Sequence, residues 1–266
     1  MPRQSRLLFL TAFLFTFCLF LFAFFFVAHT QTAPPSHGVV RLKVKYKSGD
    51  ATRELPRKRF FLIKGSVDEN RELIERIKQT SVPSRQCYYR NRGASAGLIK
   101  WLEDNDCESA YCRAIEEKYF NGSDAVPEFQ AAYEQAKREL KNDDLARRWL
   151  TNYLPTEIRS GFYDDKQKAI QTLMNVAESS TKTGVVSVMT DRKGTAYFTN
   201  IEPGTYTISN LVASETEKTS ILWICEREVK AVDLGTAMKR PFTLSNEKDP
   251  KVKCEVIERP LPVCEK

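Results

Sequence analysis

The spacing of apolar residues changes three times along the chain, and each change marks a boundary between predicted segments. Residues 7–28 contain no charged side chain. Residues 39–47 alternate between apolar and basic positions, which is the period of a half-buried strand. From 66 to 183 apolar residues recur at helical spacing, and from 184 to 246 strand patterns return. The chain is therefore predicted to be an α+β protein in which a helical insertion interrupts a β domain.

The predicted β domain consists of residues 38–65 and 184–246. In the first part Val40, Leu42 and Val44 share one face, and a second strand is expected at 59–63. Further short strands are expected at 185–189, 196–198, 205–208, 221–224 and 241–244. Short strands at intervals of about ten residues are typical of antiparallel sandwiches and barrels. The strands before the insertion are therefore expected to pair with the strands after it.

The insertion, residues 66–183, is predicted to be entirely helical. Ser66 and Glu69 fit a capping box at its start. Later helices are expected at 95–103, 107–119, 125–141, 143–154 and 164–178. Asp106 is expected to act as the N-cap of the helix that carries Cys107.

The uncharged residues 7–28 predict a membrane-spanning helix. Twenty-two helical residues extend about 33 Å, which is enough to cross a hydrocarbon core of about 30 Å. Residues 1–6 form a short basic stub on the cytoplasmic side, and 29–37 form a linker. Good small-x-small cleavage positions are missing, which favours an uncleaved anchor. Secretion after removal of a signal peptide is the alternative.

Six cysteines follow the apolar segment, and they predict disulfide bonds. They are Cys87, Cys107, Cys112, Cys225, Cys254 and Cys264, the last two in a tail at 247–266. An even set without a C-x-x-C pair favours disulfides in an oxidising compartment. Three lie in the insertion and three outside it, so full pairing requires an odd number of bonds between the two groups. The alternative is that some are free, small buried residues.

The basic excess of the chain is concentrated near its predicted anchor. The net charge is +7, and residues 38–65 hold nine Lys or Arg residues against Asp50 and Glu54. A localised excess of this kind argues against a nucleic-acid partner. The candidates for contact with anionic lipid or an acidic envelope polymer are Arg41, Lys43, Lys45, Lys47, Arg57, Lys58 and Arg59. The alternative is an ordinary solvated strand face. Basic residues beside a span prefer the cytoplasm, which conflicts with the compartment that the cysteines predict.

Few residues offer catalytic chemistry. Both histidines, His29 and His37, lie beside the apolar segment, which argues against His-dependent nucleophiles and His-ligated zinc. Asp104 and Asp106 form an Asp-x-Asp sequence, for which helix capping is preferred to metal binding. No cofactor or metal is predicted. Four aromatic residues are candidates for a ligand groove, although a core position is preferred: Tyr88, Tyr89, Trp101 and Trp149.

Residues 190–208 resemble the carboxypeptidase regulatory-like family, also called transthyretin-like or prealbumin-like. The residues that carry the resemblance are Thr190, Asp191, Gly194, Tyr197, Phe198, Pro203, Gly204 and Tyr206. Asp191 is expected to cap a turn and Gly194 to adopt positive φ. Tyr206 is expected to point into the core. The resemblance covers 38–64 and 184–246 and implies a prealbumin-like antiparallel sandwich. It also implies a non-catalytic module, of a kind often accessory to secretion, surface attachment or partner binding.

These observations predict a single-pass, extracytoplasmic, non-enzymatic binding or scaffolding module of the cell envelope. A protein partner is expected on the helical insertion. One alternative is an anchored enzyme that works through carboxylates of the insertion, and another is a plain structural spacer. Two insertion carboxylates that converge in one concave pocket would favour the enzyme.

Overall fold

The computed structural model describes residues 36–181, 183–231, 234–247, 249–250 and 252–264. The chain divides into two units, Met1–Ser36 and His37–Lys266, and the second is described below. The predicted stub 1–6, the predicted span 7–28 and most of the linker lie outside the described residues. In the described part of the chain, no helix combines the length and hydropathy needed to span a bilayer.

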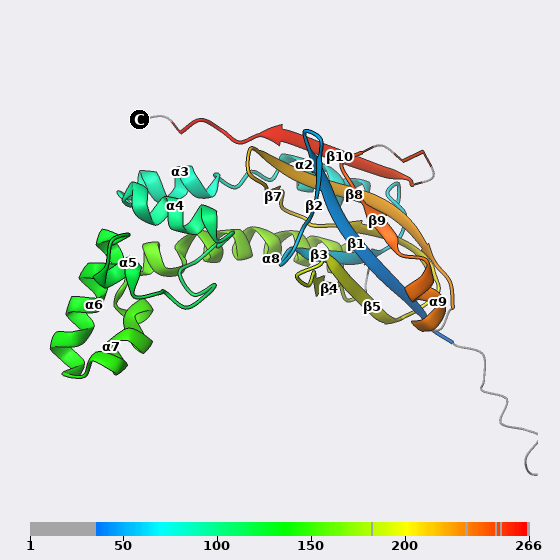
Figure 1. Ribbon diagram of the computed structural model, residues 1–266. Helices are drawn as coiled ribbons and strands as arrows, with labels where there is room; N and C mark the ends of the chain where they lie inside the picture. Colours follow the sequence, from blue (N-terminus) through cyan, green and yellow to red (C-terminus); the bar gives the residue numbers. More distant parts are fainter. Residues whose placement is uncertain (1–35, 182, 232–233, 248, 251, 265–266) are drawn as a thin grey trace, which may run out of the picture. The chain divides into compact units, whose positions relative to one another are not determined.

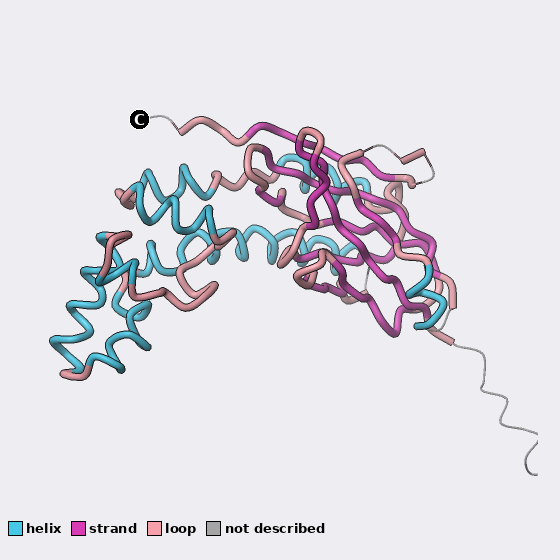
Figure 2. The backbone as a smooth tube through the Cα atoms, viewed as in Figure 1, coloured by secondary structure: helices cyan, strands magenta, loops and turns pink. Residues whose placement is uncertain are grey.

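The strands form two sheets (Figures 1 and 2). In the first, β1 (Gly38–Ser48) pairs antiparallel with β2 (Ala51–Glu54) and β5 (Thr195–Ile201), and parallel with β9 (Phe242–Leu244). The second has the order β10-β8-β6-β3-β4, with β7 paired to β8, and every pairing in it is antiparallel. Its strands are β3 (Arg59–Lys64), β4 (Val186–Met189), β6 (Gly204–Ser209), β7 (Ser214–Glu215), β8 (Thr219–Val229) and β10 (Cys254–Pro260). The prediction of an α+β fold with antiparallel sheets is confirmed.

Side chains from both sheets share one apolar core. Val40, Leu42 and Val44 alternate with half-buried basic residues along β1, as the sequence pattern predicts. They belong to the same buried cluster as Phe60 of β3 and Trp223 of β8, whose rings lie 5.8 Å apart. The two sheets therefore bury their facing surfaces against each other.

Helices follow β3 and continue until β4. They are α2 (Arg71–Gln79), α3 (Arg85–Asn91), α4 (Ala96–Asp104), α5 (Lys118–Asn121), α6 (Pro127–Leu140), α7 (Asp143–Trp149) and α8 (Phe162–Thr181). A 3₁₀ turn (Leu150–Tyr153) and a π turn (Glu157–Gly161) connect the last two, and α9 (Leu234–Lys239) lies between β8 and β9. Figure 1 shows α8 extending from the group α3–α7 toward the sheets.

The helices contribute to two further cores. Leu73 of α2 and Leu173 of α8 pack with Phe61 and Ile63 on the outer face of the larger sheet. Tyr89, Trp101 and Phe129 belong to a separate core of α3–α7. Strand β3 is thus apolar on both faces, with Phe60 and Leu62 inside the sandwich and Phe61 and Ile63 beneath the helices. A strand covered on both sides has a continuous apolar sequence, because neither face meets water.

The predicted capping box is formed. The Glu69 backbone N–H donates to Ser66 Oγ over 3.2 Å, and the Ser66 N–H donates to Glu69 Oε2 over 2.6 Å. The bond from the Ser66 backbone lowers the pKa of Glu69. The regular helix begins later, at Arg71.

The helix predicted at 107–119 is wrong. Helix α4 ends at Asp104, and 107–117 form a loop closed by the disulfide Cys107–Cys112. The two Cα atoms lie 5.6 Å apart, whereas residues five apart in an α-helix are separated by about 7.5 Å along the axis. Asp106 has a φ of 47° and is therefore no N-cap. Helix α3 was not predicted.

The predicted tail at 247–266 is also wrong for its central part. Strand β10 pairs with β8 along its whole length, from Cys254 opposite Cys225 to Pro260 opposite Thr219. Val252 and Val256 pack against the sandwich core. The segment is an edge strand of the larger sheet.

The turn before β5 has the predicted geometry. The Asp191 carboxylate accepts hydrogen bonds from the backbone N–H groups of Lys193 and Thr195, each over 2.8 Å. These bonds, with that from Thr195 the stronger cause, lower the pKa of Asp191. Gly194 has a φ of 64°, and Tyr206 is buried.

Gly194→Ala is expected to lower the free energy of unfolding by about 2 kcal/mol. A side chain at this position adopts an unfavourable φ and also collides with the Val44 carbonyl oxygen. Gly49 has a similar φ of 60° but open space around it, so Gly49→Ala isolates the backbone term and should cost about 1 kcal/mol. Urea unfolding of the two variants checks this, and equal losses would contradict it.

Candidate functional site

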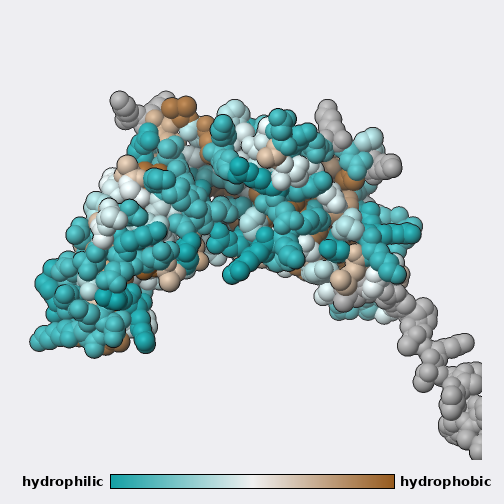
Figure 3. Space-filling view, viewed as in Figure 1, coloured by the Kyte–Doolittle hydropathy of each residue, from teal (hydrophilic) through white to brown (hydrophobic). Residues whose placement is uncertain are grey.

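A groove of about 1030 Å³ is lined by strands, insertion helices and the C-terminal segment. Tyr46 and Glu215 belong to the strands, Arg85 and Asp106 to the insertion, and Pro262 to the C-terminal segment. Three segments distant in sequence therefore meet at this one concave surface. Figure 3 shows that hydrophilic residues dominate the face in view and that apolar surface is limited to small patches.

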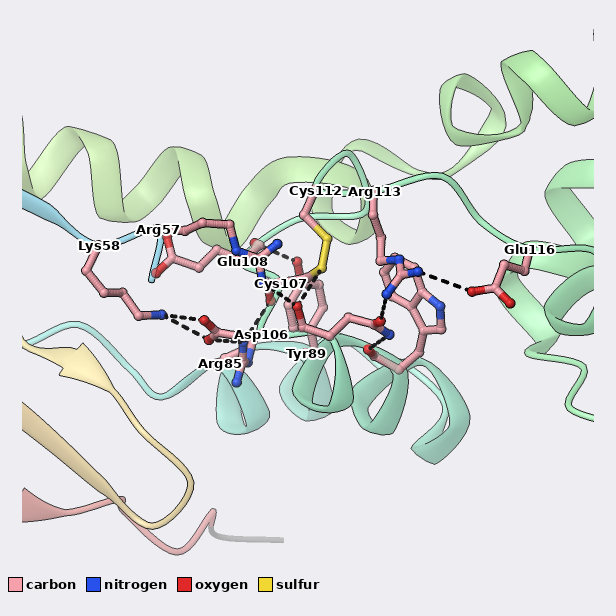
Figure 4. The surroundings of a disulfide bond; sticks show 12 residues. Arg57, Lys58, Arg85, Tyr89, Asp106, Cys107, Glu108, Cys112, Arg113 and Glu116 are labelled. Atoms are coloured by element: carbon pink, nitrogen blue, oxygen red, sulfur yellow. Dashed lines mark hydrogen bonds and ion pairs between the residues drawn. A yellow bond between two sulfur atoms is a disulfide. The ribbon is translucent and has the colours of Figure 1, made fainter. Parts of the chain in front are cut away.

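An ion pair joins the sandwich to the insertion at this groove. Lys58 follows β2 and is only 7% exposed. Its Nζ donates to both carboxylate oxygens of Asp106, over 2.9 and 3.0 Å. Arg85 of α3 lies beside the same carboxylate, with Nη1 3.8 Å from Asp106 Oδ1 and 2.9 Å from the Cys107 carbonyl oxygen. Figure 4 shows Lys58 pointing at Asp106.

Two further carboxylates complete this cluster. Glu215 of β7 accepts a hydrogen bond from the Arg85 backbone N–H over 2.6 Å, and its other oxygen lies 3.9 Å from Arg85 Nε. Lys166 of α8 lies 2.5 Å from Glu108 Oε1. We call these six residues the charge cluster: Lys58, Arg85, Asp106, Glu108, Lys166 and Glu215. Three cations and three carboxylates balance one another, as partly buried charges require.

The two most enclosed carboxylates have opposite pKa shifts. Burial raises the pKa of Glu215, and the hydrogen bond and charge of Arg85 offset this only in part. Burial also acts to raise the pKa of Glu108, but Lys166, Lys58 and Arg85 together outweigh it, and the net pKa is lowered. Of these two carboxyl groups, Glu215 therefore keeps its proton to higher pH.

The raised pKa of Glu215 predicts a pH-dependent effect of Glu215→Gln. A raised pKa in the folded state adds stability below the ordinary pKa, near 4.5, and this stability is lost as pH rises through the raised value. Glutamine has no such loss, so the stability of the variant relative to the wild type should increase from pH 4 to pH 7. Urea unfolding at both pH values checks this.

The exposed Glu217 provides a matched control for that measurement. Glu217→Gln makes the same chemical change two residues away and outside the charge cluster. The same pH dependence in both variants would contradict a role for the burial of Glu215.

All six cysteines predicted to form disulfides are paired. Cys225 and Cys254 join β8 to β10, Cys107 and Cys112 close the loop after α4, and Cys87 is bonded to Cys264. The Cys87–Cys264 bond is thus the one disulfide that joins a cysteine of the insertion to a cysteine outside it. This agrees with the odd number of such bonds that full pairing requires. The Cys87–Cys264 bond, with Cα atoms 5.1 Å apart, fastens the C-terminal segment to α3 beside the groove.

The predicted basic surface is not one continuous patch. Lys58 is wrong as a surface contact, because it is buried against Asp106. Lys43 pairs with Glu54, and Lys47 with Glu247, so part of the charge on β1 is neutralised. Two of the remaining candidates donate to backbone carbonyls, Arg41 to that of Met238 and Arg57 to that of Asn105. Lys45 is half-buried, and Arg59 is exposed.

The aromatic candidates are mostly core residues. Tyr88, Tyr89 and Trp101 are at most 3% exposed, whereas Trp149 is 53% exposed on α7. Burial raises the pKa of Tyr89. Within the part of the chain that the structure describes, no group of three or more His, Cys, Asp or Glu side chains could hold a metal ion.

Sequence reasoning missed Arg85, Glu108, Lys166 and Glu215. A signal existed for Lys166, which occupies the apolar stripe of α8 between the buried Phe162 and Ile170. A lysine in such a stripe has to find a partner or leave the core. The other three have no comparable local pattern.

Comparison with family models, with curated proteins and with solved structures found no match to this chain.

Proposed function

We propose that this protein is a membrane-anchored, extracytoplasmic binding module without enzymatic activity, and that its ligand occupies the groove. The observation that carries the proposal is the composition of the groove, whose walls come from the sandwich, the insertion and the C-terminal segment. Ion pairs and the Cys87–Cys264 bond hold these walls together. A concave surface with fixed walls binds a ligand at a small entropic cost.

The disulfides support the proposed compartment. Three bonds among six cysteines favour an oxidising environment outside the cytoplasm. Alkylation of freshly isolated membranes, followed by non-reducing peptide mapping, should find all six thiols protected. Free thiols in that material would contradict the compartment.

The fold supports the resemblance to carboxypeptidase regulatory-like domains. Two mainly antiparallel sheets around a shared core, and a turn capped by Asp191, suit a prealbumin-like sandwich. Since that family consists of non-catalytic modules, the resemblance adds weight to a binding role. The insertion then supplies the part of the groove that is particular to this protein.

A polypeptide segment is the ligand class that suits the groove best. Its lining combines apolar side chains, such as Leu55, Pro56 and Pro262, with charged side chains of both signs. An extended polypeptide presents apolar and charged groups in this mixture, with main-chain hydrogen-bonding groups between them. The partner is therefore expected to be a protein.

Photocrosslinking in native membranes tests the proposal. A benzoylphenylalanine at Arg90, which is exposed in the groove, should give one discrete adduct with a protein partner. Lys218→Glu in the same chain reverses a second groove charge and should reduce that adduct several-fold. Arg138 on α6 is exposed and does not line the groove, so a probe there is the matched control. An adduct of equal yield from Arg138, or none from Arg90, would contradict the proposal.

One observation favours a carboxylate enzyme as a second candidate. Asp106 from the insertion and Glu215 both line the groove, and burial raises the pKa of Glu215. Such a pair suits a general acid and an ionised partner. However, Lys58 Nζ donates to both oxygens of Asp106, and one oxygen of Glu215 accepts from the Arg85 backbone N–H, so both carboxylates already take part in contacts that hold the groove together.

Glu215→Gln separates the two functions. A binding module should give the same adduct from Arg90 with Glu or Gln at position 215. An enzyme with Glu215 as its acid should release a cleaved partner in the wild type and retain an intact one in the variant.

A further inference from the structure

A second pocket, of about 340 Å³, lies between the start of β1, the end of β8 and α9. Its described lining carries four cationic side chains, Arg41, Arg227, Lys230 and Arg240, against one carboxylate, Glu228. Arg227, Lys230 and Arg240 are exposed. Only Lys230 forms an ion pair with Glu228 among the described residues, at 3.5 Å. The pocket is therefore an electropositive site with cations available to a ligand.

Arg41 and Arg227 are held in place by their surroundings. Arg41 Nη1 donates to the Met238 carbonyl at the end of α9, while its Nε is buried and has no hydrogen-bond partner in the described chain. Arg227 lies over the Phe242 ring, 5.1 Å from its centroid. Cations fixed in this way lose little freedom when they meet an anion.

The chain enters the domain beside this pocket. Gly38, the first residue of β1, packs so closely on the end of β8 that a Cβ there would lie 2.5 Å from the Lys230 carbonyl oxygen. Figure 1 shows α9 next to this end of β1. The nine-residue linker 29–37 spans at most about 30 Å when fully extended. In a protein anchored through 7–28, only this short linker separates the anchor in sequence from the strand that lines the pocket.

We propose that this pocket binds the phosphate headgroup of an anionic lipid of the anchoring membrane. The inference rests on the proposed anchoring through residues 7–28. A pocket of this volume admits one headgroup. Its cationic side chains attract the net negative charge that an anionic lipid carries and a zwitterionic lipid lacks. Met238, 48% exposed on α9, adds an apolar contact beside the pocket.

The full chain in detergent, titrated with dioctanoyl-phosphatidylglycerol and followed by native mass spectrometry, tests the inference. Arg227→Gln/Arg240→Gln should weaken binding at least tenfold, since it removes two of the four cations that line the pocket. Arg138→Gln/Arg148→Gln removes two exposed arginines on α6 and α7 and should leave binding unchanged. Arg227→Lys/Arg240→Lys keeps the charge and should restore most of the affinity.

Two further ligands identify the source of the phosphate. Dioctanoyl-phosphatidylcholine and inorganic phosphate should both bind at least tenfold more weakly than the anionic lipid. Equal binding of either one, or equal losses in the pocket and control variants, would overturn the assignment. Carbonate extraction of membranes tests separately whether residues 7–28 anchor the protein, and photocrosslinking tests separately whether the groove binds a partner. A negative result in either experiment can therefore be distinguished from a failure of the pocket to bind lipid.

Discussion

Replacement of Cys87 and Cys264 by alanine is expected to lower the free energy of unfolding by about 5 kcal/mol. The bond joins residues separated by 177 positions, so it removes more conformational entropy from the unfolded chain than either of the other two. The remaining disulfides shorten this loop only modestly, because they span 5 and 29 residues. Urea unfolding under non-reducing conditions measures the loss.

Cys107→Ala/Cys112→Ala is the matched control for that prediction. It removes the same number of sulfur atoms but a loop of only 5 residues, and it should cost about 2 kcal/mol. A loss equal to or larger than that of the Cys87/Cys264 variant would contradict the chain-entropy account. Because Cys264 fastens the C-terminal segment beside the groove, the Arg90 adduct should also weaken in the Cys87/Cys264 variant.

Lys166→Met is expected to lower the free energy of unfolding by about 3 kcal/mol at pH 7. The lysine side chain is 10% exposed, and its removal leaves Glu108 without the cation 2.5 Å away. The lowered pKa of Glu108 contributes stability above its ordinary pKa, and this stability is lost as pH falls through the folded value. The difference between the variant and the wild type should therefore shrink at pH 4.

Lys166→Met/Glu108→Leu should recover most of that loss, since it removes both charges together and leaves apolar groups in their place. Lys100 and Asp104 form an exposed ion pair of 2.7 Å on α4, so Lys100→Met is the matched control and should lower the stability far less than Lys166→Met. A double variant as unstable as Lys166→Met would show that the pair itself, rather than the uncompensated carboxylate, stabilises the fold.

Strands and turns could be predicted because their signals are local. The alternation of Val40, Leu42 and Val44 with basic residues defines the buried face of β1 whatever packs against it. Asp191 and Gly194 specify their turn through bonds and a φ value within a few residues. The apolar run of β3 likewise predicted a strand, although not what covers its two faces.

Two elements could not be predicted because contacts that the hydrophobic pattern does not show decide them. Cys112, Ile115 and Tyr119 have helical spacing, but the bond to Cys107 holds 107–117 as a loop. The segment at 254–260 becomes a strand through its pairing with β8, from Cys254 opposite Cys225 to Pro260 opposite Thr219. In both cases a contact through space overrides a local preference.

The charge cluster is the clearest case of a feature invisible in the sequence. Lys58 belongs to a basic run that predicts a surface, yet it is buried against Asp106, 48 residues away. Glu215 lies in a two-residue strand and resembles any surface acid. Coulombic energies depend on distance through space and on exclusion of water, and neither quantity is set by neighbouring residues in the chain.

By itself the sequence determined the α+β class, the buried face of β1, the turn at Asp191 and the cysteines that pair. These follow from side-chain periodicity, from backbone preferences and from the even number of cysteines, all of which act over a few residues or on the whole composition. Only the tertiary structure decided which charges meet, which cysteine reaches which, and where the groove and the cationic pocket lie. Those features arise where the sheets, helices and C-terminal segment pack together and exclude water. The energies of their contacts depend on that packing and not on any one segment.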